Sequence, residues 1–132
     1  MNRKEAVKQA GYKVGQSYAD RILPFSIRVS RDYYIKGTPN FKMAMRMART
    51  GNWDGAAELW KKETTNFKIK VQGRACYNMA IISEINGDLD AAIVWAQKSY
   101  EISGKHLSLF YLNVLKDRRY QSNRLKSQTE GQ

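Results

Sequence analysis

The 132-residue sequence contains one cysteine, one histidine and two prolines, and it has no long uninterrupted apolar run. A single cysteine excludes a disulfide within the chain. One cysteine and one histidine cannot supply the ligand set of a zinc site. No window approaches the ~18 apolar residues that a membrane-spanning helix requires. The sequence therefore predicts no internal disulfide, no zinc site and no membrane span.

Catalytic motifs are also missing. Cys76 and His106 could suggest a thiol nucleophile, but Cys76 lies in an apolar helical pattern where cysteine behaves as a small hydrophobe. Asp88 and Asp90 resemble the start of a calcium loop, yet no closing glutamate follows at the needed spacing. The glycines form neither a phosphate loop nor a dinucleotide fingerprint. We therefore expect no enzyme activity, no cofactor and no metal.

What the sequence does contain is a duplicated motif. Residues 51–60 read GNWDGAAELW, and residues 87–96 read GDLDAAIVWA, so the pattern recurs after 36 positions. An apolar stripe at helical spacing precedes each copy, and another follows it. A period of this size is typical of stacked helix-turn-helix units, which cannot bury their apolar faces alone.

The residues of the motif have distinct physical roles. Gly51 and Gly87 are expected to end helices, because glycine adopts the left-handed conformation without a Cβ clash. Asn52 and Asp88 are expected to cap the helices that follow, by accepting hydrogen bonds from free backbone N–H groups. Small side chains at two positions of each copy should let the helices approach closely; these are Ala44, Ala56, Ala80 and Ala92.

At these residues the chain resembles tetratricopeptide repeat (TPR) proteins. Frames of 34 residues that begin at Gly37 and Gly73 place the family's small position 8 and its alanine at position 20 on the four alanines above. The family's large residue near position 24 corresponds to Trp60 and, one place early, to Trp95. The proline near the end of each family unit is absent. The period is also two residues longer than the family's.

The resemblance implies an all-α fold of antiparallel helix pairs over residues 37–128, with residues 105–128 as the capping helix and residues 129–132 as a frayed tail. More loosely, the whole chain resembles the C-terminal part of an uncharacterised bacterial family of TPR-containing, often envelope-associated proteins. That second resemblance implies no activity.

A concave ligand groove is also implied by the TPR resemblance. Asn78 would either hold a ligand backbone or bond a neighbouring helix, and Arg118 would either face the ligand or lie in a solvated face. The aromatic members could equally be packing residues. The implied groove residues are Phe41, Met45, Arg49, Arg74, Tyr77, Asn78, Ile81, Tyr111 and Arg118.

Residues 1–36 follow a different pattern. Residues 3–20 predict an amphipathic helix ended by Pro24, and residues 25–31 alternate like a half-buried strand that residues 32–35 extend. A lone strand leaves an unpaired edge. It could pair with a second copy in a homodimer through residues 25–35, end a preceding α/β domain of which residues 1–36 are a remnant, or lie along the repeats as an arm. We favour the second interpretation.

The net charge is +11, and most of the excess lies in the two flanks of the repeats. An excess of positive charge favours binding to nucleic acid, anionic lipid or acidic proteins, but it does not select among these partners. The basic start has no apolar core, so it is not a signal peptide. The chain as written is expected in the cytoplasm, or in the cell envelope if it is a fragment of an exported protein.

We therefore expect a non-catalytic protein–protein interaction module that binds a peptide or protein segment in the groove. The alternatives are nucleic-acid binding through the basic flanks and a structural assembly module.

Overall fold

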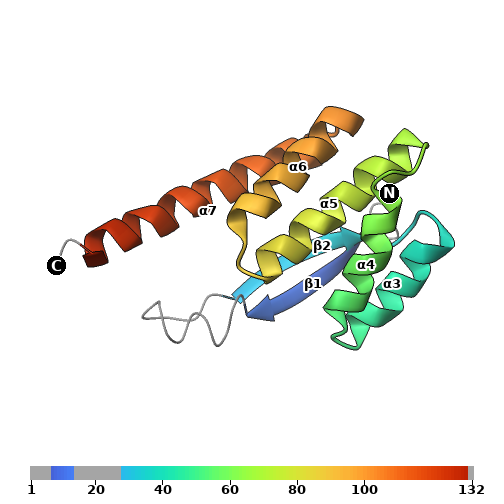
Figure 1. The fold of residues 1–132 in the computed structure, drawn as a ribbon, viewed down its shortest axis with the longest axis horizontal. Helices are drawn as coiled ribbons and strands as arrows, with labels where there is room; N and C mark the ends of the chain where they lie inside the picture. The colour runs from blue at the N-terminus through green and yellow to red at the C-terminus, as the bar shows by residue number, and fades with distance from the viewer. Residues whose placement is uncertain (1–6, 14–27, 131–132) are drawn as a thin grey trace.

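A computed structural model describes residues 7–13 and 28–130, which form two strands and five helices. Strands β1 (Val7–Lys13) and β2 (Arg28–Tyr34) precede the helices. The helices are α3 (Pro39–Arg49), α4 (Trp53–Glu63), α5 (Ile69–Ile85), α6 (Leu89–Ser103) and α7 (His106–Glu130) (Figure 1). The expectation of a mostly helical fold is confirmed.

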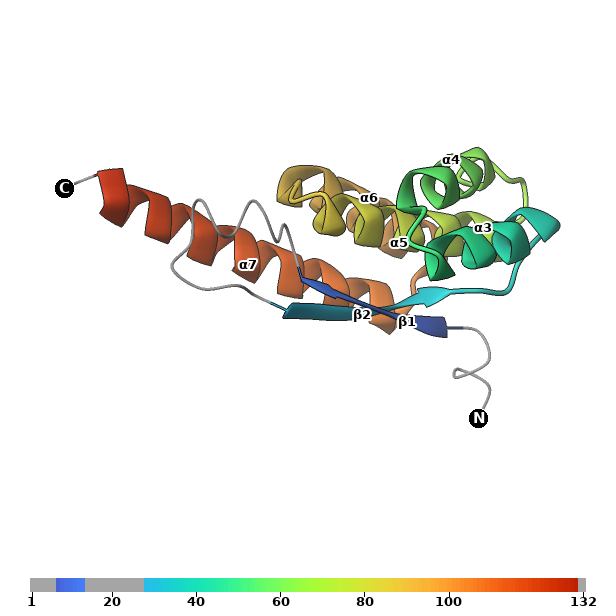
Figure 2. The same cartoon turned by 90° about the horizontal axis from the view of Figure 1, so that it is seen from below.

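Each helix packs against the next one along the chain, and β2 packs against α5. Figure 2 shows the two strands lying together along one side of the helices. The core runs between the helices and continues to the strand, since Tyr33 belongs to the same buried cluster. The four alanines predicted to permit close helix approach, Ala44, Ala56, Ala80 and Ala92, are all fully buried.

The turns of the duplicated motif have the predicted geometry. Gly51 and Gly87 follow the ends of α3 and α5 with φ angles of 84° and 79°, in the left-handed region. The side chain of Asn52 accepts a hydrogen bond of 3.0 Å from the backbone N–H of Gly55. Asp88 accepts an equivalent bond of 3.0 Å from Ala91. Local sequence therefore fixes where α4 and α6 begin.

Replacing Asp88 with alanine is expected to lower the free energy of unfolding by about 1 kcal/mol, because the first turn of α6 loses its side-chain cap. Urea unfolding followed by circular dichroism measures the change. Asp117→Ala is the matched control, since Asp117 is exposed on α7. Equal effects of the two substitutions would contradict a specific capping role.

The predicted N-terminal helix is wrong where the structure describes it. Val7–Lys13 is a strand, paired antiparallel with β2 in a register that runs from Val7 opposite Tyr34 to Lys13 opposite Arg28. Gly11 weakens a helix by about 1 kcal/mol relative to alanine, and pairing with β2 satisfies backbone groups that a lone strand would leave open. Helical periodicity alone could not reveal this long-range pairing. The remainder of the predicted helix and residues 25–27 lie outside the described residues.

The pairing also bears on the homodimer through residues 25–35, which stays a prediction because the described two-stranded sheet still has outer edges. That proposal assumed a strand without a partner, whereas β2 pairs with β1 of the same chain. Of the three interpretations, the arm along the repeats agrees with the contact between β2 and α5.

Helix α7 continues to Glu130, two residues into the predicted frayed tail, because no proline or glycine interrupts it before Gly131. Much of its second half is exposed. Within the described ranges, no helix combines the length and apolarity needed to cross a bilayer.

Candidate functional site

The structure brings several of the predicted groove residues together, but not as an open groove. A short stretch of the chain itself lies against them: residues 33–37, hereafter the docked segment, which includes the end of β2. Five predicted groove residues are at most 4% exposed, namely Phe41, Tyr77, Asn78, Ile81 and Tyr111. For the aromatic members this burial agrees with the alternative that they are packing residues.

Asn78 holds the main chain of the docked segment with both ends of its side-chain amide. The backbone N–H of Tyr34 donates to Oδ1 of Asn78 at 2.8 Å. Nδ2 of Asn78 donates to the carbonyl oxygen of Tyr34, also at 2.8 Å. The amide thus pairs with one residue of an extended chain as a neighbouring strand would. Because Asn78 is fully buried, these bonds satisfy a side chain that has no access to water.

The two tyrosines of the docked segment contact different helices. Tyr33 lies against α4, with its ring centroid 5.9 Å from Trp53 and 5.4 Å from Trp60. Tyr34 lies against α5, with its ring 5.3 Å from Tyr77 in an edge-to-face arrangement. Pairs at these separations add to the stabilisation that burial alone provides.

Two arginines act on the docked segment, one through direct contacts and one through its charge. Arg74 donates from its guanidinium to the carbonyl oxygen of Lys36 at 2.9 Å, and the same guanidinium lies 5.1 Å from the centre of the Tyr34 ring. Arg49 is exposed on α3. Burial raises the pKa of Tyr33, and the positive charge of Arg49 partly offsets that rise. Met45, the remaining predicted groove residue of α3, packs against the core from a partly buried position.

A buried carboxylate contacts Tyr111, one of the predicted groove residues. Glu84 is fully buried on α5. The hydroxyl of Tyr111 donates to one of its oxygens at 2.6 Å, and Nε of Arg118 lies 3.3 Å from the other. Tyr111 also contacts Tyr77, with centroids 5.2 Å apart. Arg118 is therefore an ion-pair partner of a buried carboxylate, and its side chain is 27% exposed.

Cys76 is 1% exposed, as expected of a small apolar residue, and burial raises the pKa of its thiol from 9.0 to about 11. Because the reactive species is the thiolate, a rise of this size lowers its population about a hundredfold at pH 8. The folded protein keeps this thiol protonated to a higher pH than the unfolded chain does. The stabilising contribution of the protonated thiol is therefore complete below pH 9, and it is lost as the pH rises through 11.

We expect Cys76 of the folded protein to react with an aromatic disulfide reagent at least about a hundredfold more slowly than in the urea-unfolded protein. The absorbance of the released thiolate at pH 8 gives both rates. Similar rates in the two states would show that the thiol is accessible in the fold.

Comparison with known families divides the chain near the docked segment. Residues 42–117 match the model of a domain of unknown function, DUF6340, and residues 1–34 match that of another domain of unknown function, DUF8603. Neither the curated proteins nor the solved structures include a match to this chain. Since the first match covers more than half of the 132 residues, the chain belongs to the DUF6340 family.

Proposed function

We propose that residues 37–128 form a non-catalytic, TPR-like protein-interaction module whose concave surface holds an extended polypeptide segment. The observation that carries the proposal is the pair of hydrogen bonds between the Asn78 amide and the main chain of Tyr34. A side chain that pairs with both main-chain groups of one residue recognises extended conformation, whatever the sequence.

The helical architecture supports the TPR-like interpretation. Helices α3 and α4 pack together, as do α5 and α6, and α7 packs on α6. The turns within the two pairs have the same left-handed glycine and the same capping bond. The buried alanines recur with the sequence motif. These features are those of two equivalent units followed by a closing helix.

The contacts also define the chemistry of the segment. Main-chain recognition by Asn78 and Arg74 selects an extended chain, and the aromatic surfaces beside them select two consecutive aromatic side chains. In this structure the segment is the chain's own Tyr33–Tyr34 pair. The module accordingly joins the two-stranded sheet to the helices, and a segment from another protein would have to take the place of this one.

A synthetic peptide with the sequence of residues 28–36 tests the proposal. The double variant Tyr33→Ala/Tyr34→Ala keeps the helices but weakens the docked segment, so it is expected to bind the peptide at least tenfold more tightly than the native chain does. Fluorescence anisotropy of the labelled peptide gives the affinities. Circular dichroism verifies that the variant remains helical.

A scrambled peptide of the same composition is the control for charge and aromatic content. A third variant that adds Asn78→Ala to the double variant should lose the peptide. If the scrambled peptide binds equally well, or if the loss of Asn78 leaves the affinity unchanged, the concave surface does not recognise an extended segment.

A further inference from the structure

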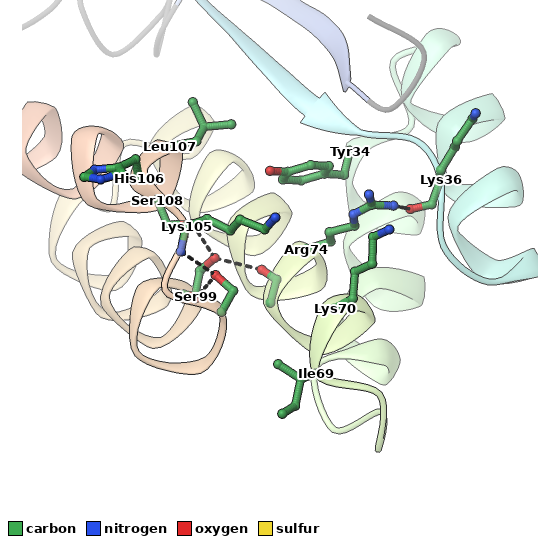
Figure 3. A pocket seen from close by; sticks show the side chains of 12 residues that line it. Tyr34, Lys36, Ile69, Lys70, Arg74, Ser99, Lys105, His106, Leu107 and Ser108 are labelled. Carbon is green, nitrogen blue, oxygen red and sulfur yellow. Dashed lines mark hydrogen bonds between the residues drawn. The ribbon is translucent and has the colours of Figure 1, made fainter. Parts of the chain in front are cut away.

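A second feature of the molecule is a cavity of about 830 Å³ between the ends of several elements. The starts of α5 and α7, the last turns of α6 and the docked segment enclose it (Figure 3). Its volume lies within the range of small-molecule sites, about 300–1,000 Å³. The lining residues are Tyr34, Lys36, Ile69, Lys70, Gly73, Arg74, Ser99, Ser103, Lys105, His106, Leu107 and Ser108.

The lining is positively charged and has no counter-charge of its own. None of these twelve described residues is acidic, and four are lysine or arginine. Figure 3 shows the amine of Lys105 reaching toward α5, and the guanidinium of Arg74 and the amine of Lys70 lying together on the side that faces Lys36. The side chains of Lys36 and His106 point away from the cavity. Neither Lys70 nor Lys105 forms an ion pair with any described residue. Like charges that face one cavity attract an anion.

Backbone donors add to this field. The first hydrogen bond of α5 joins the N–H of Gln72 to the carbonyl of Lys68, so the N–H groups of residues 69–71 have no acceptor within the helix, and Lys68 supplies no side-chain cap. Helix α7 also begins at the cavity, where the carbonyl of Lys105 accepts from Ser108 and Leu109. The positive end of each helix dipole therefore reinforces the lysines and the arginine.

The buried serines of the cavity are already satisfied. Ser99 donates to the carbonyl oxygen of Gly73 at 2.8 Å, and its Oγ lies 2.8 Å from that of Ser108. Their hydroxyls connect α5, α6 and α7. A ligand in the cavity would therefore bind to the charged side chains of the lining and not to these serines.

We propose that this cavity binds a phosphate group through Lys70, Arg74 and Lys105. Three cations that line one cavity call for more than one negative charge, which a single carboxylate lacks. A phosphate monoester carries nearly two charges at neutral pH and three strong acceptor oxygens. The site goes beyond the peptide-binding surface proposed above, because Lys70 and Lys105 take no part in holding the docked segment.

The phosphate has two sources to distinguish, a soluble phosphate compound and a lipid headgroup. Near the cavity, Ile69 is 62% exposed, and Phe67 in the preceding loop is 86% exposed. Apolar side chains of this kind, with lysines beside them, suit the surface of an anionic membrane. They contribute nothing to the binding of a soluble anion.

Isothermal titration of the full chain with inorganic pyrophosphate tests the site. We expect one site per chain, binding that weakens as salt rises, and a loss of about tenfold in affinity for Lys70→Gln or Lys105→Gln, each of which removes one charged donor. Lys61→Gln is the matched control, because Lys61 is an exposed lysine of α4 outside the cavity. It should bind as the native protein does.

Co-sedimentation with vesicles of phosphatidylcholine, with and without phosphatidic acid, is the second arm. Binding to acidic vesicles alone, lost in Lys70→Gln and weakened in Phe67→Ala, assigns the phosphate to a lipid. Pyrophosphate binding that Phe67→Ala leaves unchanged assigns it to a soluble compound. The proposal is overturned if the native chain binds neither probe, or if Lys61→Gln weakens binding as much as the cavity variants do.

Discussion

Asn78→Ala is expected to lower the free energy of unfolding by about 3 kcal/mol. The substitution leaves both main-chain groups of Tyr34 without their partners, and an unpaired buried polar group costs about 1–3 kcal/mol. It also leaves a small void in a fully buried position of α5. The loss should centre on the docked segment, because Asn78 bonds to nothing else in the described chain.

Two measurements separate release of the segment from general unfolding. Urea unfolding gives the overall change, and hydrogen exchange of the Tyr34 amide gives the local one, expected to be about a hundredfold faster in the variant. Asn113→Ala, at an exposed position of α7, is the control and should change neither. An unchanged exchange rate at Tyr34 would mean that Asn78 does not hold the segment.

Trp60→Ala is expected to lower the free energy of unfolding by about 4 kcal/mol, within the range found when a buried tryptophan or phenylalanine becomes alanine. Trp60 is the largest fully buried side chain of the described core, and it contacts Tyr33 of the docked segment. Its indole N–H has no hydrogen-bond partner among the described residues. Trp60→Phe should therefore cost only about 1–2 kcal/mol, since it removes volume but no hydrogen bond.

Trp95 provides the matched comparison, because it is the counterpart of Trp60 in the second copy of the motif. It is only partly buried, and the amine of Lys98 lies 5.0 Å from its ring. Trp95→Ala should cost roughly 1–2 kcal/mol, in proportion to its smaller buried area. Thermal unfolding by calorimetry ranks the three variants. Equal losses of unfolding free energy for Trp60→Ala and Trp95→Ala would contradict the unequal burial of the two tryptophans.

The features that the sequence predicted well are local ones. Gly51 and Asn52, like Gly87 and Asp88, act on the turn in which they stand, so a few neighbouring residues determine their geometry. The burial of Cys76 was expected from its place on an apolar helix face. The N-terminal strand was missed because pairing with β2, and not the pattern of residues 7–13, decides its conformation.

The candidate site shows the same division. The sequence identified Asn78 as a side chain able to hold a backbone, but it could not supply the occupant, which lies 44 residues earlier in the chain. The phosphate cavity was missed altogether. Lys70 belongs to α5 and Lys105 to the loop before α7, and only packing of the helices brings both residues to one cavity. The net charge favoured the flanks as the site of anion binding, whereas Lys70 and Arg74, two of the three proposed phosphate ligands, lie within the repeats.

The docking of Tyr34 on Asn78 also has a consequence for how the molecule folds. Closing a loop of 44 residues costs about 3 kcal/mol in chain entropy, by the logarithmic dependence on loop length. The helices need only contacts between neighbours along the chain, which form fast. We therefore expect the helices to assemble first and the strand to arrive last. During that interval Tyr77 and Arg74 are uncovered on a folded helix, and a competing segment would meet them then.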